Sequence, residues 1–261
     1  MNSIQRPDCV VALDADYTLC SRMTPEPLFR SRGITLERFI RKVKCLEEVL
    51  EMGDPAFYLQ FLSEVNNGKL QGVTKEEMKR SGSRVPLYRG VGGFLTDLAM
   101  SERPKVRVDV VSMGMREIIE GIASIGMAVR KTGGGIYATS LYNGKGMVKY
   151  LNDAPMIVTR EMKPMIMLMN AAQLEGTAEK HVGMERFLYI GDSECDEPTF
   201  DMMRERGGTS LLVFDENDER RREYADRMKK EGRVTETAPA DYTRGSGAYT
   251  FAMEWVRQQA H

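Results

Sequence analysis

The sequence has 261 residues, with 37 Lys and Arg against 38 Asp and Glu, and a formal charge of −1. This length suits one large domain or two small ones, and the balanced charge argues against an electrostatic nucleic-acid binder. No apolar run approaches the roughly 20 residues that cross a bilayer, so we expect no membrane partner. We also expect no secretory signal peptide, because polar residues 1–8 lead directly into an apolar run.

The cysteine and histidine content narrows the chemistry further. The four cysteines lack the paired spacing of a metal site and predict reduced thiols in the cytoplasm; they are Cys9, Cys20, Cys45 and Cys195. The chain contains two histidines, His181 and His261, which argues against a histidine-based triad or a multi-histidine metal site. Carboxylate oxygen chemistry is the better expectation.

The first apolar run, residues 9–13, ends in two acids. Such a run predicts a strand buried on both faces. Asp14 and Asp16 follow it two residues apart, so an extended chain would point both toward the same side. Two carboxylates held this close repel each other unless a cation or a shared proton compensates.

Residues 21–90 have no strand pattern and predict a mostly helical insert. Segment 35–51 has apolar residues at a spacing of three and four, with Thr35 as a plausible N-cap. Further helices are expected at 55–62, after Thr74 and at 91–100.

Strand and helix patterns alternate in the rest of the chain. The expected strands are 106–111, 187–190 and 211–214, and a β-hairpin is expected from residue 136 through the turn Asn143-Gly144. Helices are expected at 115–127, 164–175, 215–231 and 245–261. Short apolar strands that alternate with helices predict an α/β fold with a parallel sheet covered on both faces.

Polar residues collect where these predicted strands end. They are Asp14 and Asp16, then Ser112, then Asp192 and Asp196. In open parallel sheets ligands bind outside the carboxyl ends of the strands. The sequence therefore predicts a ligand site at that edge.

Taken in order, these motifs resemble those of the haloacid dehalogenase-like (HAD) superfamily of phosphoryl-transfer enzymes. The residues that match are Asp14, Asp16 and Thr18 in the first motif, Ser112 in the second, and Gly191, Asp192 and Asp196 in the fourth. The Ser-x-Gly form at Ser112–Gly114 resembles the phosphoserine-phosphatase-like branch, and the helical insert resembles a C1 cap. The resemblance implies a three-layer Rossmann-like core, residues 1–20 and 103–261, with a cap at 21–102.

The third motif of that family is a lysine. Lys163 lies 29 residues before Asp192, whereas Lys145 lies 47 before it. The shorter spacing matches the family, so we expect Lys163 to be this lysine and keep Lys145 as the alternative.

The resemblance also implies roles for these residues. Mg²⁺ would be held by Asp14, Asp16, Asp192 and Asp196, with Asp196 acting through water or orienting other groups. Asp14 would attack phosphorus, and Asp16 would serve as the general acid and base. Phosphate oxygens would be bound by Ser112, by the backbone of Met113 and Gly114, and by Lys163.

The expected function is a Mg²⁺-dependent phosphatase that acts on a small phosphorylated metabolite through an aspartyl-phosphate. We expect a cytoplasmic monomer or homodimer. Two alternatives stay open: a phosphomutase or phosphotransferase that uses the same intermediate, and a non-catalytic member that binds a phosphorylated ligand. Fold resemblance alone does not decide between them.

Overall fold

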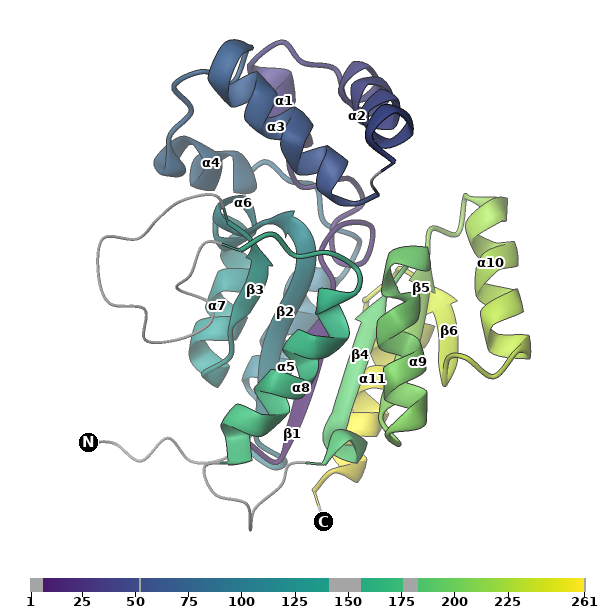
Figure 1. Ribbon diagram of the computed structural model, residues 1–261. Helices are drawn as coiled ribbons and strands as arrows, with labels where there is room; N and C mark the ends of the chain where they lie inside the picture. The colour runs from purple at the N-terminus through teal and green to yellow at the C-terminus, as the bar shows by residue number, and fades with distance from the viewer. Residues whose placement is uncertain (1–6, 52, 141–155, 176–182, 261) are drawn as a thin grey trace.

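The computed structural model describes residues 7–51, 53–140, 156–175 and 183–260. Its centre is a six-stranded sheet with the order β3-β2-β1-β4-β5-β6, in which all neighbouring strands are parallel (Figure 1). The strands are β1 (Cys9–Leu13), β2 (Val106–Met115), β3 (Ile136–Thr139), β4 (Phe187–Gly191), β5 (Thr209–Phe214) and β6 (Glu236–Pro239). The α/β fold predicted from the alternating pattern is confirmed.

Strand β1 lies in the middle of the sheet and is buried along its whole length. Val11 and Leu13 belong to the core on one face, and Val10 and Ala12 to the core on the other. An uninterrupted apolar run is what a strand covered on both faces requires. Because β1 is the buried central strand, the acids that follow it lie at the middle of the sheet's carboxyl edge.

Helices cover both faces of the sheet. One face carries α5 (Val91–Ala99), α7 (Ala123–Thr132) and α11 (Gly247–Gln258), and the other carries α8 (Met162–Glu175), α9 (Glu197–Glu205) and α10 (Glu219–Lys230). The expected C-terminal helix docks through Ala248, Ala252, Trp255 and Val256, all of which are buried. The three-layer core thus includes the end of the chain.

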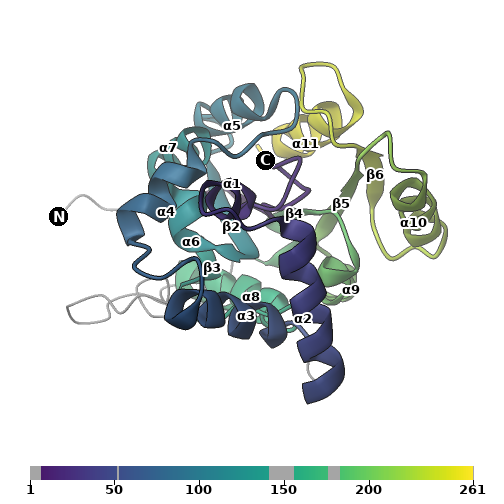
Figure 2. The same ribbon diagram turned by 90° about the horizontal axis from the view of Figure 1, so that it is seen from above.

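Helices α1 to α4 form the insert between β1 and β2, above the carboxyl ends of the strands (Figures 1 and 2). Their bounds are α1 (Glu26–Ser31), α2 (Leu36–Leu50), α3 (Pro55–Asn67) and α4 (Lys75–Gly82). The predicted N-caps form, because the Thr35 and Thr74 side chains accept from backbone N–H groups. Phe29 packs on Phe39, with ring centroids 4.5 Å apart, and on Phe61, which gives the insert its own apolar centre.

Two antiparallel segments join the insert to the core. The Ser21 N–H donates to the Pro86 carbonyl at 3.0 Å, and the Tyr88 N–H donates to the Leu19 carbonyl at 2.9 Å. Gly90, where the returning segment ends, has φ +82°, and a Cβ there would overlap the backbone of Tyr242. The connection is therefore a paired two-stranded strap.

The helix expected over 115–127 is interrupted. It forms as α6 (Arg116–Glu120) and α7, separated at Gly121. A Cβ at Gly121 would overlap the Lys79 backbone, and one at Gly82 would overlap the Ile118 carbonyl. The break therefore follows from the close approach of α4 to α6, which local periodicity does not reveal.

Other expectations need correction or fall outside the described residues. The strand expected to end at Val111 continues to Met115, with a register shift between Ser112 and Met115 against β3. The first arm of the expected hairpin is β3, which pairs in parallel with β2, while the turn Asn143-Gly144 lies outside the described residues. Sequence patterns did not indicate α1, α9 or β6.

The proposed division into core and cap stays a prediction. Helix α5, which the expected cap boundary at residue 102 includes, packs against β2 and α7 of the core. These contacts favour a cap that ends before Val91. Among the helices that the structure describes, none has both the length and the apolar character needed to span a membrane.

Candidate active site

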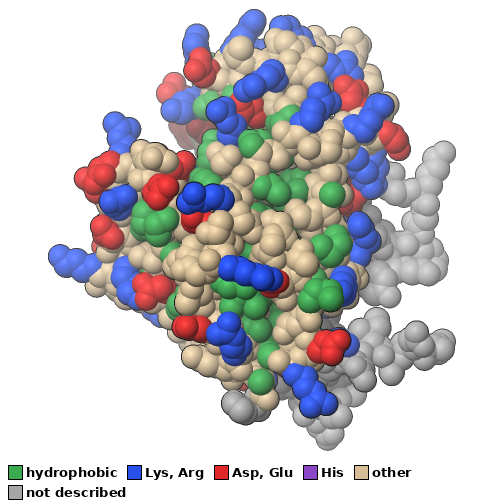
Figure 3. Space-filling model, turned by 180° about the vertical axis from the view of Figure 1, so that it is seen from behind, with side chains coloured by type: hydrophobic (Ala, Val, Ile, Leu, Met, Phe, Trp, Pro, Cys, Tyr) green, Lys and Arg blue, Asp and Glu red, His purple; other side chains and the backbone are tan. Residues whose placement is uncertain are grey.

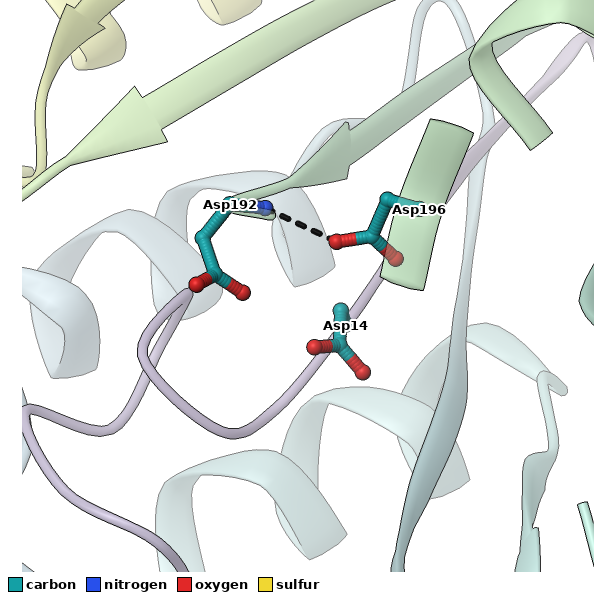
Figure 4. A group of neighbouring side chains, drawn as sticks. All are labelled: Asp14, Asp192 and Asp196. Carbon is teal, nitrogen blue, oxygen red and sulfur yellow. Dashed lines mark hydrogen bonds between the residues drawn. The ribbon is translucent and has the colours of Figure 1, made fainter. Parts of the chain in front are cut away.

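Three buried carboxylates meet at the carboxyl ends of β1 and β4. Asp14 follows β1, and Asp192 and Asp196 follow β4; each offers an oxygen within 4.8 Å of the others (Figure 4). Asp196 is turned back toward the strand end, because its Oδ2 accepts from the N–H groups of Asp192 at 2.9 Å and Ser193 at 3.3 Å. The turn after Gly191 thus builds part of the site through its own backbone.

Lys163, in the first turn of α8, joins two of these acids. Its Nζ lies 3.2 Å from Asp14 Oδ1 and 2.7 Å from Asp196 Oδ1, and its side chain is 1% exposed. Burial acts against its charge, but Asp14 and Asp196 together raise the pKa of Lys163 well above its usual range. The Tyr189 hydroxyl donates to Asp196 Oδ1 at 2.5 Å. Lys163 and Tyr189 therefore both hold this carboxylate oxygen in place.

The two acids of the first motif have raised pKa values. Burial, opposed by Lys163, raises the pKa of Asp14 to about 6. Burial and the neighbouring Asp14 raise the pKa of Asp16 to about 7. Asp16 Oδ1 accepts from the Thr24 N–H at 2.7 Å. Asp16 is therefore anchored by the segment that leads into the cap, with a pKa suited to proton transfer near neutral pH.

Ser112 lies on β2, directly beside β1 in the sheet. It is 1% exposed, and its Oγ accepts from the Gly114 N–H at 3.1 Å. The Tyr58 hydroxyl, on helix α3 of the insert, donates to the carbonyls of Met113 and, at 3.1 Å, of Val158. A residue of the insert therefore touches the Ser-Met-Gly segment.

The second acid of the cluster, Asp192, has a donor at each carboxylate oxygen. Thr18 Oγ1 donates to its Oδ1 at 3.2 Å, and Arg221 Nη1 donates to its Oδ2 at 2.5 Å. Burial, reinforced by Asp196 and Asp14, raises the pKa of Asp192 well above its usual value. Arg221 comes from the first turn of α10, so a helix far from the motifs contributes a cation to the cluster.

The cluster fits a divalent metal ion. All its donors are carboxylate oxygens, the ligands that Mg²⁺ prefers. Asp14 Oδ1 is buried and pairs with Lys163 Nζ at 3.2 Å, without the geometry of a hydrogen bond. Asp14, Asp192 and Asp196 together carry more negative charge than Lys163 and Arg221 can offset, which favours a further cation.

The structure brings the predicted site residues into one region. Asp14, Asp192, Asp196 and Lys163 are in direct contact or adjacent, and Asp16 and Ser112 flank Asp14. The alternative lysine, Lys145, lies outside the described residues.

Three arginines between β1 and α5 pair with acids of the chain. Arg30 pairs with Glu26, Arg32 with Glu77 and Arg89 with Asp241. Sequence reasoning missed four residues that touch the site: Thr24 through its backbone N–H, and Tyr58, Tyr189 and Arg221 through their side chains. Only Tyr189 carried a signal, as a hydroxyl in a buried apolar strand that ends at the fourth motif.

Acidic and basic side chains are interspersed on the face seen in Figure 3. The described part of that face carries no large region of one charge. This distribution matches the balanced composition of the chain.

Comparison with known proteins shows the fold. No model of a known protein family matches the chain. An uncharacterised protein of Borreliella burgdorferi is 23% identical, with 95% of this chain and 96% of that protein covered. Among solved structures, a HAD family hydrolase from Salmonella enterica serovar Typhi has a TM-score of 0.56 and 16% identity; the match covers 81% of this chain and 64% of that one.

Two further solved structures are similar over most of their length. A phosphoserine phosphatase in its apo form has a TM-score of 0.53 and 16% identity, with 88% of this chain and 92% of that chain covered. Cytosolic 5′-nucleotidase IIIB bound to cytidine has a TM-score of 0.54 and 14% identity, with 98% and 88% covered. The chain therefore has the fold of the HAD-like hydrolases, with a helical insert after the first strand, as its motifs predicted.

Proposed function

We propose that this protein is a Mg²⁺-dependent phosphatase that hydrolyses a small phosphomonoester through an aspartyl-phosphate on Asp14. The observation that carries the proposal is the setting of Asp14. Its carboxylate is buried beside two further acids, Asp192 and Asp196, and Lys163 Nζ lies 3.2 Å from its Oδ1. Three buried carboxylates this close repel one another, and a metal ion would supply the further positive charge that offsets the repulsion.

Each residue of the site has a task in this reaction. Asp14 attacks phosphorus, while Asp16 gives a proton to the leaving oxygen and later takes one from the attacking water. Ser112 and the N–H groups of Met113 and Gly114 hold phosphoryl oxygens, and Lys163 balances the charge of Asp14 and the phosphoryl group. Mg²⁺, held by Asp14, Asp192, the Asp16 backbone and, directly or through water, Asp196, would screen the charge between the nucleophile and its anionic substrate.

The presence of Asp16 favours phosphate-ester chemistry over dehalogenation. A phosphate ester needs a proton on its leaving oxygen, and the pKa of about 7 lets Asp16 carry that proton near neutral pH. Four free cysteines support a cytoplasmic location as part of the proposal.

Phosphate release from a panel of small phosphomonoesters tests the proposal. Wild type should release phosphate with Mg²⁺ and stop reversibly in chelator. Asp14→Asn should abolish release while the protein stays folded, and Asp226→Asn, an exposed acid on α10, is the matched control. A fully active Asp14→Asn protein would refute the mechanism. A rearranged phosphoester in place of free phosphate would identify a phosphomutase.

A further inference from the structure

Arg221 holds the carboxylate that the proposed metal ion needs. Its Nη1 lies 2.5 Å from Asp192 Oδ2, with the arginine side chain 29% exposed and the aspartate 3% exposed. The other oxygen of Asp192 accepts from Thr18. Each oxygen of Asp192 therefore has one donor from this chain, and a divalent cation that binds Oδ2 meets a guanidinium charge at contact distance.

The charges of the other two carboxylates, Asp14 and Asp196, are neutralised by a different cation. Lys163 serves Asp14 and Asp196 from a position that is 1% exposed. Both of its carboxylate partners belong to the cluster, so it neutralises the cluster from within. Arg221 is the peripheral cation, since it reaches Asp192 from the edge of the site and keeps part of its surface in solvent.

Arg221 also has partners that could receive it away from Asp192. Its guanidinium lies over the Tyr17 ring, 4.6 Å from the centroid, and its Nε lies 3.7 Å from Asp218 Oδ2. Tyr17 is held in the left-handed region at φ +57°, between Asp16 and Thr18 of the first motif. An arginine stacked on an aromatic ring and near a second carboxylate can leave its first partner without losing all compensation.

We propose that Arg221 is a built-in counter-cation that exchanges with Mg²⁺ on Asp192. In the metal-free protein it neutralises the buried carboxylate; when the metal binds, it stays stacked on Tyr17 and turns from Asp192 toward Asp218. The exchange makes Mg²⁺ binding weaker than the three carboxylates alone would give. This inference rests on the proposed metal site and does not depend on which phosphoester is the substrate.

The exchange and a purely structural ion pair predict different effects on Mg²⁺ affinity when Arg221 is removed. If Arg221 only positions Asp192, its removal leaves a metal ligand less well placed, and Mg²⁺ binds more weakly or unchanged. If Arg221 competes with the metal, its removal makes Mg²⁺ bind more tightly. The two hypotheses therefore predict different shifts in the dissociation constant for Mg²⁺.

Calorimetric titration of the full-length protein with MgCl₂ measures that constant. We expect Arg221→Gln to bind Mg²⁺ about five- to tenfold more tightly than wild type, the size of one partly exposed ion pair. Arg220→Gln removes the same charge from an exposed neighbour on the same helix and should change the affinity much less. Asp192→Asn should lose most of the binding.

Thermal unfolding of the same proteins gives an independent readout. Without Mg²⁺, Arg221→Gln should melt below Arg220→Gln, because Asp192 is left uncompensated. Saturating Mg²⁺ should raise its melting temperature by more than that of wild type. Both measurements report on folded, metal-binding protein and need no substrate.

The outcomes separate this inference from the proposed function. Equal or weaker Mg²⁺ binding by Arg221→Gln, compared with Arg220→Gln, overturns the exchange even if the wild type is an active phosphatase. Tighter binding supports it even if the protein hydrolyses nothing in the panel. An absence of Mg²⁺ binding in every variant overturns both the exchange and the metal site.

Discussion

Replacing Arg107 with methionine should destabilise the protein, because Arg107 is the cationic partner of the fully buried Asp109. The Arg107 Nε donates to Asp109 Oδ1 at 3.0 Å, and its Nη2 donates to the Tyr137 hydroxyl at 2.9 Å. Asp109 is 0% exposed and also accepts from the Gly135 N–H at 2.8 Å and from Asn170 Nδ2 at 3.3 Å. The network lies on β2, so it helps to hold the strand that carries Ser112.

The expected loss of stability depends on the hydrogen-bond donors that Asp109 keeps. Removal of one partner from a buried ion pair costs about 3–5 kcal/mol. Two donors remain on Asp109, which places the expected loss for Arg107→Met near the lower end, at about 3 kcal/mol. The double variant Arg107→Met/Asp109→Leu leaves no buried charge and should lose less than the single variant. Arg84→Met, at an exposed arginine, should stay within about 0.5 kcal/mol of wild type.

Urea unfolding at several pH values is the assay. Burial raises the pKa of Asp109 above its usual value, and Arg107 opposes that rise. The penalty from an acid with a raised folded-state pKa is complete above that pKa, shrinks as the pH falls below it, and disappears at the acid's unfolded-state pKa of about 4. The deficit of Arg107→Met should therefore be largest near pH 7.5 and shrink as the pH falls toward about 4. A loss below about 1 kcal/mol, or a double variant worse than the single one, would refute the reasoning.

Two further predictions concern contacts between cap and core. Tyr58→Phe removes the donor to the Met113 and Val158 carbonyls. The substitution should lower the free energy of unfolding in urea by about 1 kcal/mol and weaken inhibition by inorganic phosphate. Unchanged stability and inhibition would contradict this prediction. Hydrogen bonds from Arg160 overcome the effect of burial and hold the pKa of Asp54 below its usual value. Asp54→Asn should therefore lower stability by about 1 kcal/mol at pH 7 and converge with wild type as the pH falls toward 3. A difference in melting temperature that persists unchanged at pH 3 would argue against this linkage.

The sequence by itself determined the sheet and the position of the acids at its edge. A five-residue apolar run suits a strand covered on both faces, and in a parallel sheet flanked by helices the residues that follow it emerge at the carboxyl ends. The same reasoning predicted that Ser112 and Asp192 lie at this edge, because each was expected at the end of a strand of the same sheet. The catalytic and metal-binding roles of these residues stay predictions.

Only the tertiary structure decided which side chains complete the site. Arg221 lies in a run so charged that its pattern indicates a solvated helix, and Tyr58 lies in an apolar stretch that indicates a core helix. Their partners, Asp192 and Met113, are 29 and 55 residues away along the chain. Such contacts depend on how helices pack over the sheet edge, and packing carries no local periodicity. The break at Gly121 has the same origin, because the carbonyl that excludes a side chain there belongs to another helix.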